Sequence, residues 1–236
     1  MKKLLIAMMA LAVGCGERQG GAAVRRPAEG GKLILMSMSD SSLYNHFDEK
    51  TQSWTGLEIE IVRAAAEKLG LSLEIRQSEF QELLPAVKSG DADLAVSTIA
   101  ITPARARDVA FSSPYANGGC AFLYRTGEAA PVIPVKSRNY RIGTMMSTTC
   151  QFFLCYHDVD PYCYGDCKAA LAEMKKGKLD AIFYDAETLH EAARASEGKF
   201  SVTPPVYREN YGVAVRKDFP ALLEAVNLAI AERRSK

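Results

Sequence analysis

The feature that most constrains this chain is a repeated alternation of short apolar segments with longer segments of helical period. Apolar residues at positions 57, 61, 62, 65 and 69 have the spacing of one helix face, and Gly70 ends that helix. The neighbouring segments give, in order, a strand at 33–38, this helix at 56–70, a strand at 71–76, a helix at 80–90 and a strand at 92–97. Strands and helices in this order predict βαβ units and a mainly parallel sheet.

The same alternation returns in the second half of the chain. It predicts strands at 120–125, 140–143, 179–184 and 211–216, and helices at 147–154, 167–177, 186–198 and 219–234. We therefore predict an α/β protein with two lobes of about 100 residues each, joined by a hinge, with a ligand cleft between them. The expected boundaries are 32–116 for lobe 1, 117–209 for lobe 2 and 210–236 for a return to lobe 1.

The amino terminus has the pattern of an exported protein. Residues 1–14 (MKKLLIAMMALAVG) are a basic start followed by an apolar run that is too short to span a bilayer as a mature helix. Cys15 follows small residues, as in the lipobox of bacterial lipoproteins, so residues 1–15 are interpreted as a signal peptide and a lipidated cysteine. A plain secretory signal cut nearby is the alternative. Residues 16–31 are glycine-rich without apolar period and predict a flexible tether.

The charge of the chain gives no support for nucleic-acid binding. The formal net charge is +1, and without Lys2 and Lys3 it becomes −1. The sequence also shows no Ser/His/Asp arrangement, no phosphate-cradling glycine loop and no pair of carboxylates that argues for catalysis. No cofactor and no metal are expected.

Three motifs give the chain a family resemblance. They are GLEIE at 56–60, the block LPAVKSGDADLAVSTIAITPARARDVAFSSPY at 84–115, and a set in the second half formed by RIGTMMSTTCQFFL, GKLDAIFYD and YGVAVRKDFPALLEAVN. In this order they resemble the amino-acid-binding proteins of ABC importers, the extracellular solute-binding family 3, over about residues 32–232. The resemblance implies the type II periplasmic binding protein fold.

The same resemblance implies a ligand site shared by both lobes. Arg105 matches the arginine that holds the ligand α-carboxylate, for which a planar guanidinium is well suited. Thr148 and Thr149 match a hydroxyl pair in lobe 2, and Asp185 matches the acid that pairs with the α-ammonium. The alternatives are a surface Arg105 paired with Asp108, and helix caps at the two threonines and at Asp185.

The chain departs from the family pattern at two places. Ala100 stands where a threonine or serine hydroxyl usually helps to hold the carboxylate, so its backbone N–H remains as the donor there, and Thr98 matches a position that contributes in some members. The aromatic platform of the first loop is assigned to Tyr44, with Phe47 as the alternative. Glu58 is a weaker candidate for a ligand contact.

The cysteines gather in the second half. Cys150, Cys155, Cys163 and Cys167 fall within eighteen residues, and Cys120 lies further back. In an exported protein this grouping predicts disulfides, with at least one of the five thiols left unpaired and the connectivity open. A metal site built from the four clustered cysteines and His157 is one alternative, and reduced structural thiols are another.

These features together predict a monomeric, lipid-anchored receptor outside the cytoplasmic membrane. It is expected to capture an amino acid by hinge closure and to deliver it to an ABC permease. A ligand sensor for another membrane partner is one alternative. An enzyme of the cyclohexadienyl dehydratase kind, with Glu58 or Asp185 as general acid, is the other.

Overall fold

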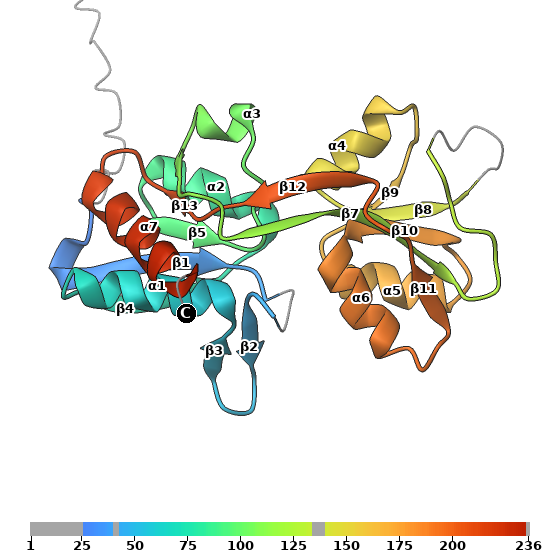
Figure 1. Cartoon of the computed structure of the whole chain (residues 1–236), viewed down its shortest axis with the longest axis horizontal. Coiled ribbons are helices and arrows are strands. Elements are labelled where there is room, and N and C mark those ends of the chain that lie inside the picture. Colours follow the sequence, from blue (N-terminus) through green and yellow to red (C-terminus); the bar gives the residue numbers. More distant parts are fainter. Residues whose placement is uncertain (1–25, 40–42, 134–139, 235–236) are drawn as a thin grey trace, which may run out of the picture.

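The computed structural model describes residues 26–39, 43–133 and 140–234. It contains two α/β lobes, each built on its own sheet, set side by side along the long axis of the molecule (Figure 1). The predicted fold class is confirmed. We call the part that carries the first sheet lobe 1 and the part that carries the second sheet lobe 2.

The sheet of lobe 1 has the strand order β4-β1-β5-β13-β6. Its central strand β1 pairs in parallel with β4 and β5, and β13, which arrives from the end of the chain, enters antiparallel between β5 and β6. The bounds are β1 (Lys32–Ser37), β4 (Ser72–Gln77), β5 (Leu94–Val96), β6 (Ala110–Phe111) and β13 (Ala214–Val215).

Helices cover both faces of this sheet, and a hairpin projects from the lobe (Figure 1). Helices α1 and α7 pack on each other and on one side of the sheet, where Leu33, Val62 and Val226 are fully buried in one core. The opposite core is capped by α2. The bounds are η1 (Glu29–Gly31), β2 (His46–Asp48), β3 (Ser53–Thr55), α1 (Leu57–Lys68), α2 (Phe80–Ser89), α3 (Pro103–Ala106) and α7 (Pro220–Arg234).

The sheet of lobe 2 has the order β11-β7-β10-β8-β9, and β12 also pairs with β7. Strand β10 pairs in parallel with β8 and antiparallel with β7. The core between this sheet and its helices is rich in aromatic side chains, with Phe122 and Phe183 in contact at 4.5 Å between ring centroids. The bounds are β7 (Ala116–Arg125), β8 (Ile142–Met145), α4 (Thr149–Tyr156), β9 (Tyr162–Tyr164), α5 (Cys167–Lys175), β10 (Ala181–Asp185), α6 (Ala186–Arg194), β11 (Phe200–Val202) and β12 (Tyr207–Tyr211).

Two antiparallel strands, β7 and β12, run between the lobes (Figure 1). Their register pairs Tyr207 with Cys120 at one end and Tyr211 with Ala116 at the other. The Tyr211 ring is fully buried, and its hydroxyl accepts a hydrogen bond of 3.1 Å from the backbone N–H of Gly119. The predicted boundaries at 116/117 and 209/210 fall at the start of β7 and inside β12.

We expect alanine at Gly118 to destabilise this strand pair. An added Cβ would lie 2.2 Å from Cε2 of Tyr211, so it would clash with a ring that is fully buried. Overpacking of this kind costs about 1–3 kcal/mol of unfolding free energy, measurable by urea denaturation. Gly165→Ala is the matched control, because its Cβ would meet the nearest atom at an ordinary 3.5 Å. Equal stabilities of the two variants would contradict the prediction.

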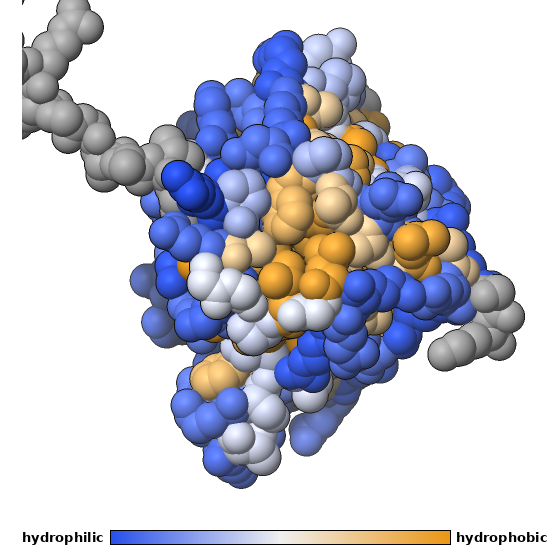
Figure 2. Space-filling model, turned by 90° about the vertical axis from the view of Figure 1, so that its left-hand side faces the viewer, coloured by the Kyte–Doolittle hydropathy of each residue, from blue (hydrophilic) through white to orange (hydrophobic). Residues whose placement is uncertain are grey.

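An apolar area lies at the lobe 1 end of the molecule. The view onto this end shows it surrounded by hydrophilic residues (Figure 2). Within the described ranges, none of the helices combines the length and the apolar character needed to cross a membrane. Cys15 and most of the predicted tether lie outside the described residues.

Candidate functional site

A small cavity of about 20 Å³ lies between the two lobes. This volume holds one or two water molecules. Both lobes and β12 contribute to its lining, which consists of Phe80, Thr98, Arg105, Thr148, Thr149, Cys150, Tyr184, Asp185, Glu209 and Tyr211. Five of the site residues predicted from the sequence are therefore brought to one place: Thr98, Arg105, Thr148, Thr149 and Asp185.

Arg105 reaches the cavity from the short helix α3. Thr102 caps this helix by accepting a 3.2 Å hydrogen bond from the backbone N–H of Arg105, which fixes where the side chain starts. One guanidinium nitrogen donates to the carbonyl of Ala100 at 3.1 Å, and the guanidinium lies 5.5 Å from the centre of the Phe80 ring. Asp108 pairs instead with Lys88 at 2.8 Å, so the surface ion pair considered for Arg105 is not present.

Thr98 lies in an unusual turn at the end of β5. Its φ is +45° and that of Ser97 is +148°, both outside the usual range for residues other than glycine. The backbone N–H of Thr98 donates at 2.8 Å to the carboxylate of Glu58, which is completely buried. Glu58 therefore holds the turn that faces the cavity and is itself not among the lining residues.

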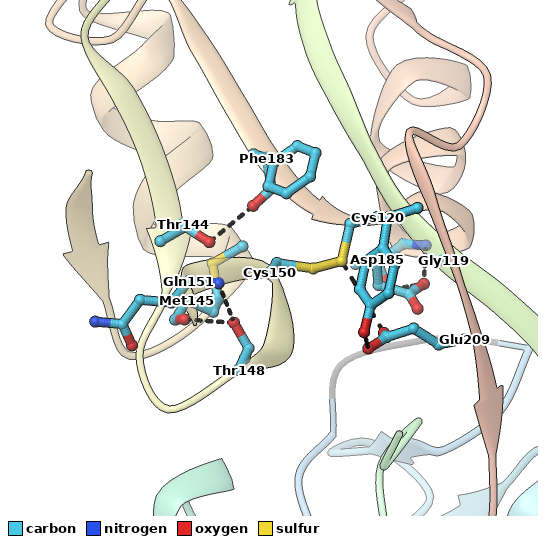
Figure 3. Close-up of a disulfide and its surroundings, with 12 residues drawn as sticks. Gly119, Cys120, Thr144, Met145, Thr148, Cys150, Gln151, Phe183, Asp185 and Glu209 are labelled. Carbon is cyan, nitrogen blue, oxygen red and sulfur yellow. Dashed lines mark hydrogen bonds between the residues drawn. A yellow bond between two sulfur atoms is a disulfide. The ribbon is translucent and has the colours of Figure 1, made fainter. Parts of the chain in front are cut away.

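The lobe 2 contribution begins at the start of α4. Thr148 caps this helix, and its hydroxyl is engaged with the carbonyl of Met145 at 2.7 Å and the N–H of Gln151 at 3.2 Å (Figure 3). Thr149 is the first helical residue, so it also presents a backbone N–H that has no partner within the helix. A helix start that faces the cavity favours an anionic group there.

Asp185 joins the end of β10 to the start of α6. One carboxylate oxygen accepts the backbone N–H groups of Glu187 and Thr188, each at 3.1 Å, so the capping role is present. The second oxygen accepts the hydroxyl of Tyr211, which comes from the hinge strand β12. Asp185 is 5% exposed, and this burial raises the pKa of its carboxyl in spite of its donors.

Glu209 is a second acid in the cavity that the sequence interpretation missed. It stands on β12, and its Oε1 accepts the Tyr207 hydroxyl at 2.9 Å. Burial raises the pKa of the Glu209 carboxyl, whereas hydrogen bonding from Thr149 and Tyr207 and the charge of Arg105 lower it by less. Its carboxylate lies beside the Cys120–Cys150 disulfide (Figure 3), with Oε2 at 4.0 Å from the Cys120 sulfur.

Tyr44 is not among the residues that line this cavity. Its ring is buried between Tyr115 and Tyr211, with centroid distances of 6.2 and 6.3 Å. Phe47 packs on Trp54 in the hairpin, outside the same lining. The lining aromatic of lobe 1 is Phe80, and the role of Tyr44 as a platform stays a prediction.

The structure contains one disulfide among the described cysteines. Cys150 is disulfide-bonded to Cys120, which tethers the first turn of α4 to strand β7 (Figure 3). Cys155, Cys163 and Cys167 are not disulfide-bonded, which corrects the expectation of bridges within the cluster. Cys155 and Cys163 are exposed, whereas Cys167 is buried in the core at the start of α5. In the part of the chain that the structure describes, no group of three His, Cys, Asp or Glu side chains is arranged to hold a metal ion.

The burial of Glu58 leads to a pH-dependent prediction. Burial raises its pKa above the ordinary value of 4.5, so between these two values the folded protein binds more protons than the unfolded chain. The stability that protonated Glu58 contributes is present below pH 4.5 and is lost as pH rises through the folded pKa. We expect the stability of Glu58→Gln relative to the wild type to rise over this window.

Urea denaturation of both proteins between pH 4.5 and 8 tests this expectation. The difference between the two proteins is the quantity to follow, because Asp185 and Glu209 also have raised pKa values and contribute equally to both. A difference that does not change with pH would contradict the prediction.

Comparisons with known proteins agree with this architecture. The model of the bacterial extracellular solute-binding proteins, family 3, matches residues 34–236. The L-cystine-binding protein TcyJ of Escherichia coli K12 is 26% identical over 182 residues, 75% of this chain and 68% of the relative. The ABC transporter arginine-binding protein 1 of the same organism is 27% identical over 183 residues, covering 75% of this chain and 74% of that protein.

A solved structure shows the same fold. The arginine-bound form of truncated ArgBP from T. maritima superposes with a TM-score of 0.79 at 24% identity, covering 86% of this chain and 96% of that chain. The match of the family model over most of the chain is the finding that identifies it. The chain belongs to the bacterial extracellular solute-binding proteins, family 3.

Proposed function

We propose that this protein captures an α-amino acid between its two lobes and delivers it to an ABC permease. The observation that carries the proposal is that Arg105 of lobe 1 and Asp185 of lobe 2 line one cavity. A guanidinium and a carboxylate at one site match the two ends of a zwitterion. Thr149 and the start of α4 add N–H donors for the α-carboxylate.

The ligand enters when the lobes separate. A cavity of about 20 Å³ cannot hold an amino acid, so the lobes have to separate at this point before a ligand can bind. Among the described residues, two hydrogen bonds join the lobes: Arg105 donates to the carbonyl of Ser147 at 3.3 Å, and the N–H of Leu43 donates to Glu191 at 3.2 Å. Hinge movement at β7 and β12 opens the cleft, and ligand contacts to both lobes then stabilise closure.

Ala100 changes how the carboxylate is held. Its side chain offers no hydroxyl, and its carbonyl accepts from Arg105, so this residue orients the arginine. The missing hydroxyl corresponds to about 0.5–1.5 kcal/mol of binding free energy. Lobe 2 and the backbone donors therefore contribute more of the carboxylate site in this protein.

Delivery to a permease requires a surface that differs between the open and the ligand-bound form, so that the permease can recognise the ligand-bound form. Lobe 2 carries exposed apolar side chains around α4, among them Phe152 at 62% and Tyr156 at 84% exposure, and lobe 1 has the apolar area of Figure 2. Exposed apolar areas of this kind mark contact sites. Because closure changes the distance between the two lobes, a permease that contacts both distinguishes the loaded form. Lipidation at Cys15 would keep the receptor at the membrane.

A thermal-shift screen of the twenty amino acids tests the proposal. A ligand at a hundred times its Kd stabilises by about 2.7 kcal/mol, which raises the Tm of a chain of this size by about 5–10 °C. We expect a shift of this size for at least one amino acid. If none of the twenty amino acids raises the Tm, the proposed amino-acid-binding function is wrong.

A second candidate, an enzyme of the cyclohexadienyl dehydratase kind, is favoured by one observation. Burial raises the pKa of Glu209 in the cavity, and a raised carboxyl pKa is a common feature of general acids. A turnover assay with prephenate and arogenate tests it: product formation that Glu209→Gln abolishes would establish the enzyme. Binding of an amino acid without turnover of either compound would exclude this enzyme activity and support the receptor function.

A further inference from the structure

The small cavity between the lobes is lined by more negative than positive charge. Among its lining residues, Arg105 is the one cation, whereas Asp185 and Glu209 are both acids. If Arg105 takes the α-carboxylate and Asp185 the α-ammonium, both ends of the ligand backbone are used. Glu209 is then left facing the ligand without a charge to balance it.

The cation whose charge acts on Glu209 is Arg105, which the ligand α-carboxylate would occupy. Within the described residues, Glu209 forms no ion pair at 4.0 Å or less, and its hydrogen-bond donors are the hydroxyls of Tyr207 and Thr149. The Cys120 sulfur, at 4.0 Å from Oε2, belongs to the disulfide and carries no charge (Figure 3). An ionised carboxylate in this position is stabilised strongly by a cation brought by the ligand.

A wide opening between the lobes is also lined by more acidic than basic residues. It lies on the hairpin side, has a volume of about 1120 Å³, and is lined by residues of both lobes. Two lysines, Lys50 and Lys168, lie on its walls. Six acids line it as well: Asp48, Glu49, Glu79, Glu82, Asp166 and Glu191.

The formal charge of this opening is therefore −4 with His46 neutral, although the whole chain has a net charge of only +1. Asp48 stays ionised well below neutral pH, because backbone N–H groups donate to it and lower its pKa. A cleft lined with one sign of charge raises the local concentration of the opposite ion and its rate of entry.

We propose that the ligand is a cationic L-α-amino acid, that Glu209 pairs with its side-chain charge, and that the acidic opening steers it into the cleft. This inference rests on the proposed amino-acid function and names the class of ligand. With such a ligand, the charges of the ligand and of the residues that line the small cavity sum to zero. A neutral side chain of the same shape would leave the buried Glu209 charge without a cationic partner, which selects against that ligand.

Isothermal titration calorimetry with two pairs of probes tests the proposal. L-arginine and L-citrulline have nearly the same shape and differ in the charge of the side chain, as do L-lysine and L-norleucine. We expect the cationic member of at least one pair to bind tenfold or more tightly than its neutral partner. In Glu209→Gln we expect that ratio to fall below threefold, whereas Glu128→Gln, which removes an exposed acid in the turn after β7, should leave it unchanged.

The outcomes separate the ligand class from the proposed function. If no amino acid binds, the proposed function fails and this inference fails with it. If neutral probes or other neutral amino acids bind as tightly as the cationic ones, the function stands and the cationic class is overturned. If the ratio persists in Glu209→Gln, the role of Glu209 is overturned. The wild-type comparison decides the ligand class even if that variant does not fold.

Discussion

Replacing Arg105 by alanine is expected to weaken binding of the amino-acid ligand by about 2–5 kcal/mol, a loss of thirtyfold or more in affinity. The guanidinium lines the cavity between the lobes and is oriented there by the Ala100 carbonyl and the Phe80 ring. Without it, the ligand α-carboxylate would be buried with no cationic partner. Calorimetry with the ligand found by thermal shift measures the effect.

The neighbouring arginine provides the control for this experiment. Arg107 is exposed two residues further on, so Arg107→Ala changes the net charge equally without touching the cavity. Arg105→Lys keeps the charge and loses the planar fork, and we expect its affinity to lie between those of the wild type and the alanine variant. A loss of less than threefold for Arg105→Ala would contradict the assignment of the carboxylate site.

Removing the Cys120–Cys150 disulfide is expected to lower the free energy of unfolding by about 3–4 kcal/mol. The bond closes a loop with a sequence separation of 30, and restricting an unfolded chain over that length gives a stabilisation of this size. The double variant Cys120→Ala/Cys150→Ala is compared with the wild type by urea denaturation without reductant. Both cysteines are buried, so alanine introduces no unpaired polar group.

A cysteine that is not in the disulfide provides the control, because its replacement shows the effect of losing a thiol without losing the bond. Cys155→Ser changes an exposed cysteine on α4, the same helix, and should alter the stability by less than about 0.5 kcal/mol. Reduction of the wild type should lower its stability by about as much as the double variant. A loss below about 1 kcal/mol in the double variant would contradict the prediction.

The sequence could predict those parts of the site that depend on local pattern. Arg105 follows a Thr-Pro helix start, Thr148 and Thr149 begin a helix, and Asp185 ends a buried strand. Each of these positions is set by a strand end or a helix cap, which short-range residue preferences specify. Their convergence on one cavity follows from the two-lobe fold, which the family motifs indicated.

Other parts of the site could not be predicted, because they depend on distant strand pairing. Glu209 lies on β12, whose sequence YRENY lacks an apolar pattern, and it enters the cavity only because β12 pairs with β7. Phe80 has the appearance of a helix core residue and becomes part of the lining through contact with Arg105.

The partner of Cys150 in the disulfide could not be predicted from the sequence for the same reason. Closeness in sequence favoured bridges among Cys150, Cys155, Cys163 and Cys167, yet the partner of Cys150 is 30 residues away on β7. Strand β10 pairs with both β7 and β8, and α4 follows β8, which brings the two halves of the bond together. A pairing of this kind is a property of the sheet order and is not visible in cysteine spacing.

The position of β13 has a consequence for the order in which the lobes form. This strand lies between β5 and β6, and α7 packs on α1, so the sheet and core of lobe 1 include the last segment of the chain. All strands of lobe 2 precede that segment. If the chain folds from the amino terminus onward as it is synthesised, lobe 2 can complete its sheet before β13 is available. At that stage the sheet of lobe 1 still has a gap between β5 and β6. Lobe 1 therefore matures last, and truncation after residue 211 would leave its hydrophobic core open although most of its sequence is present.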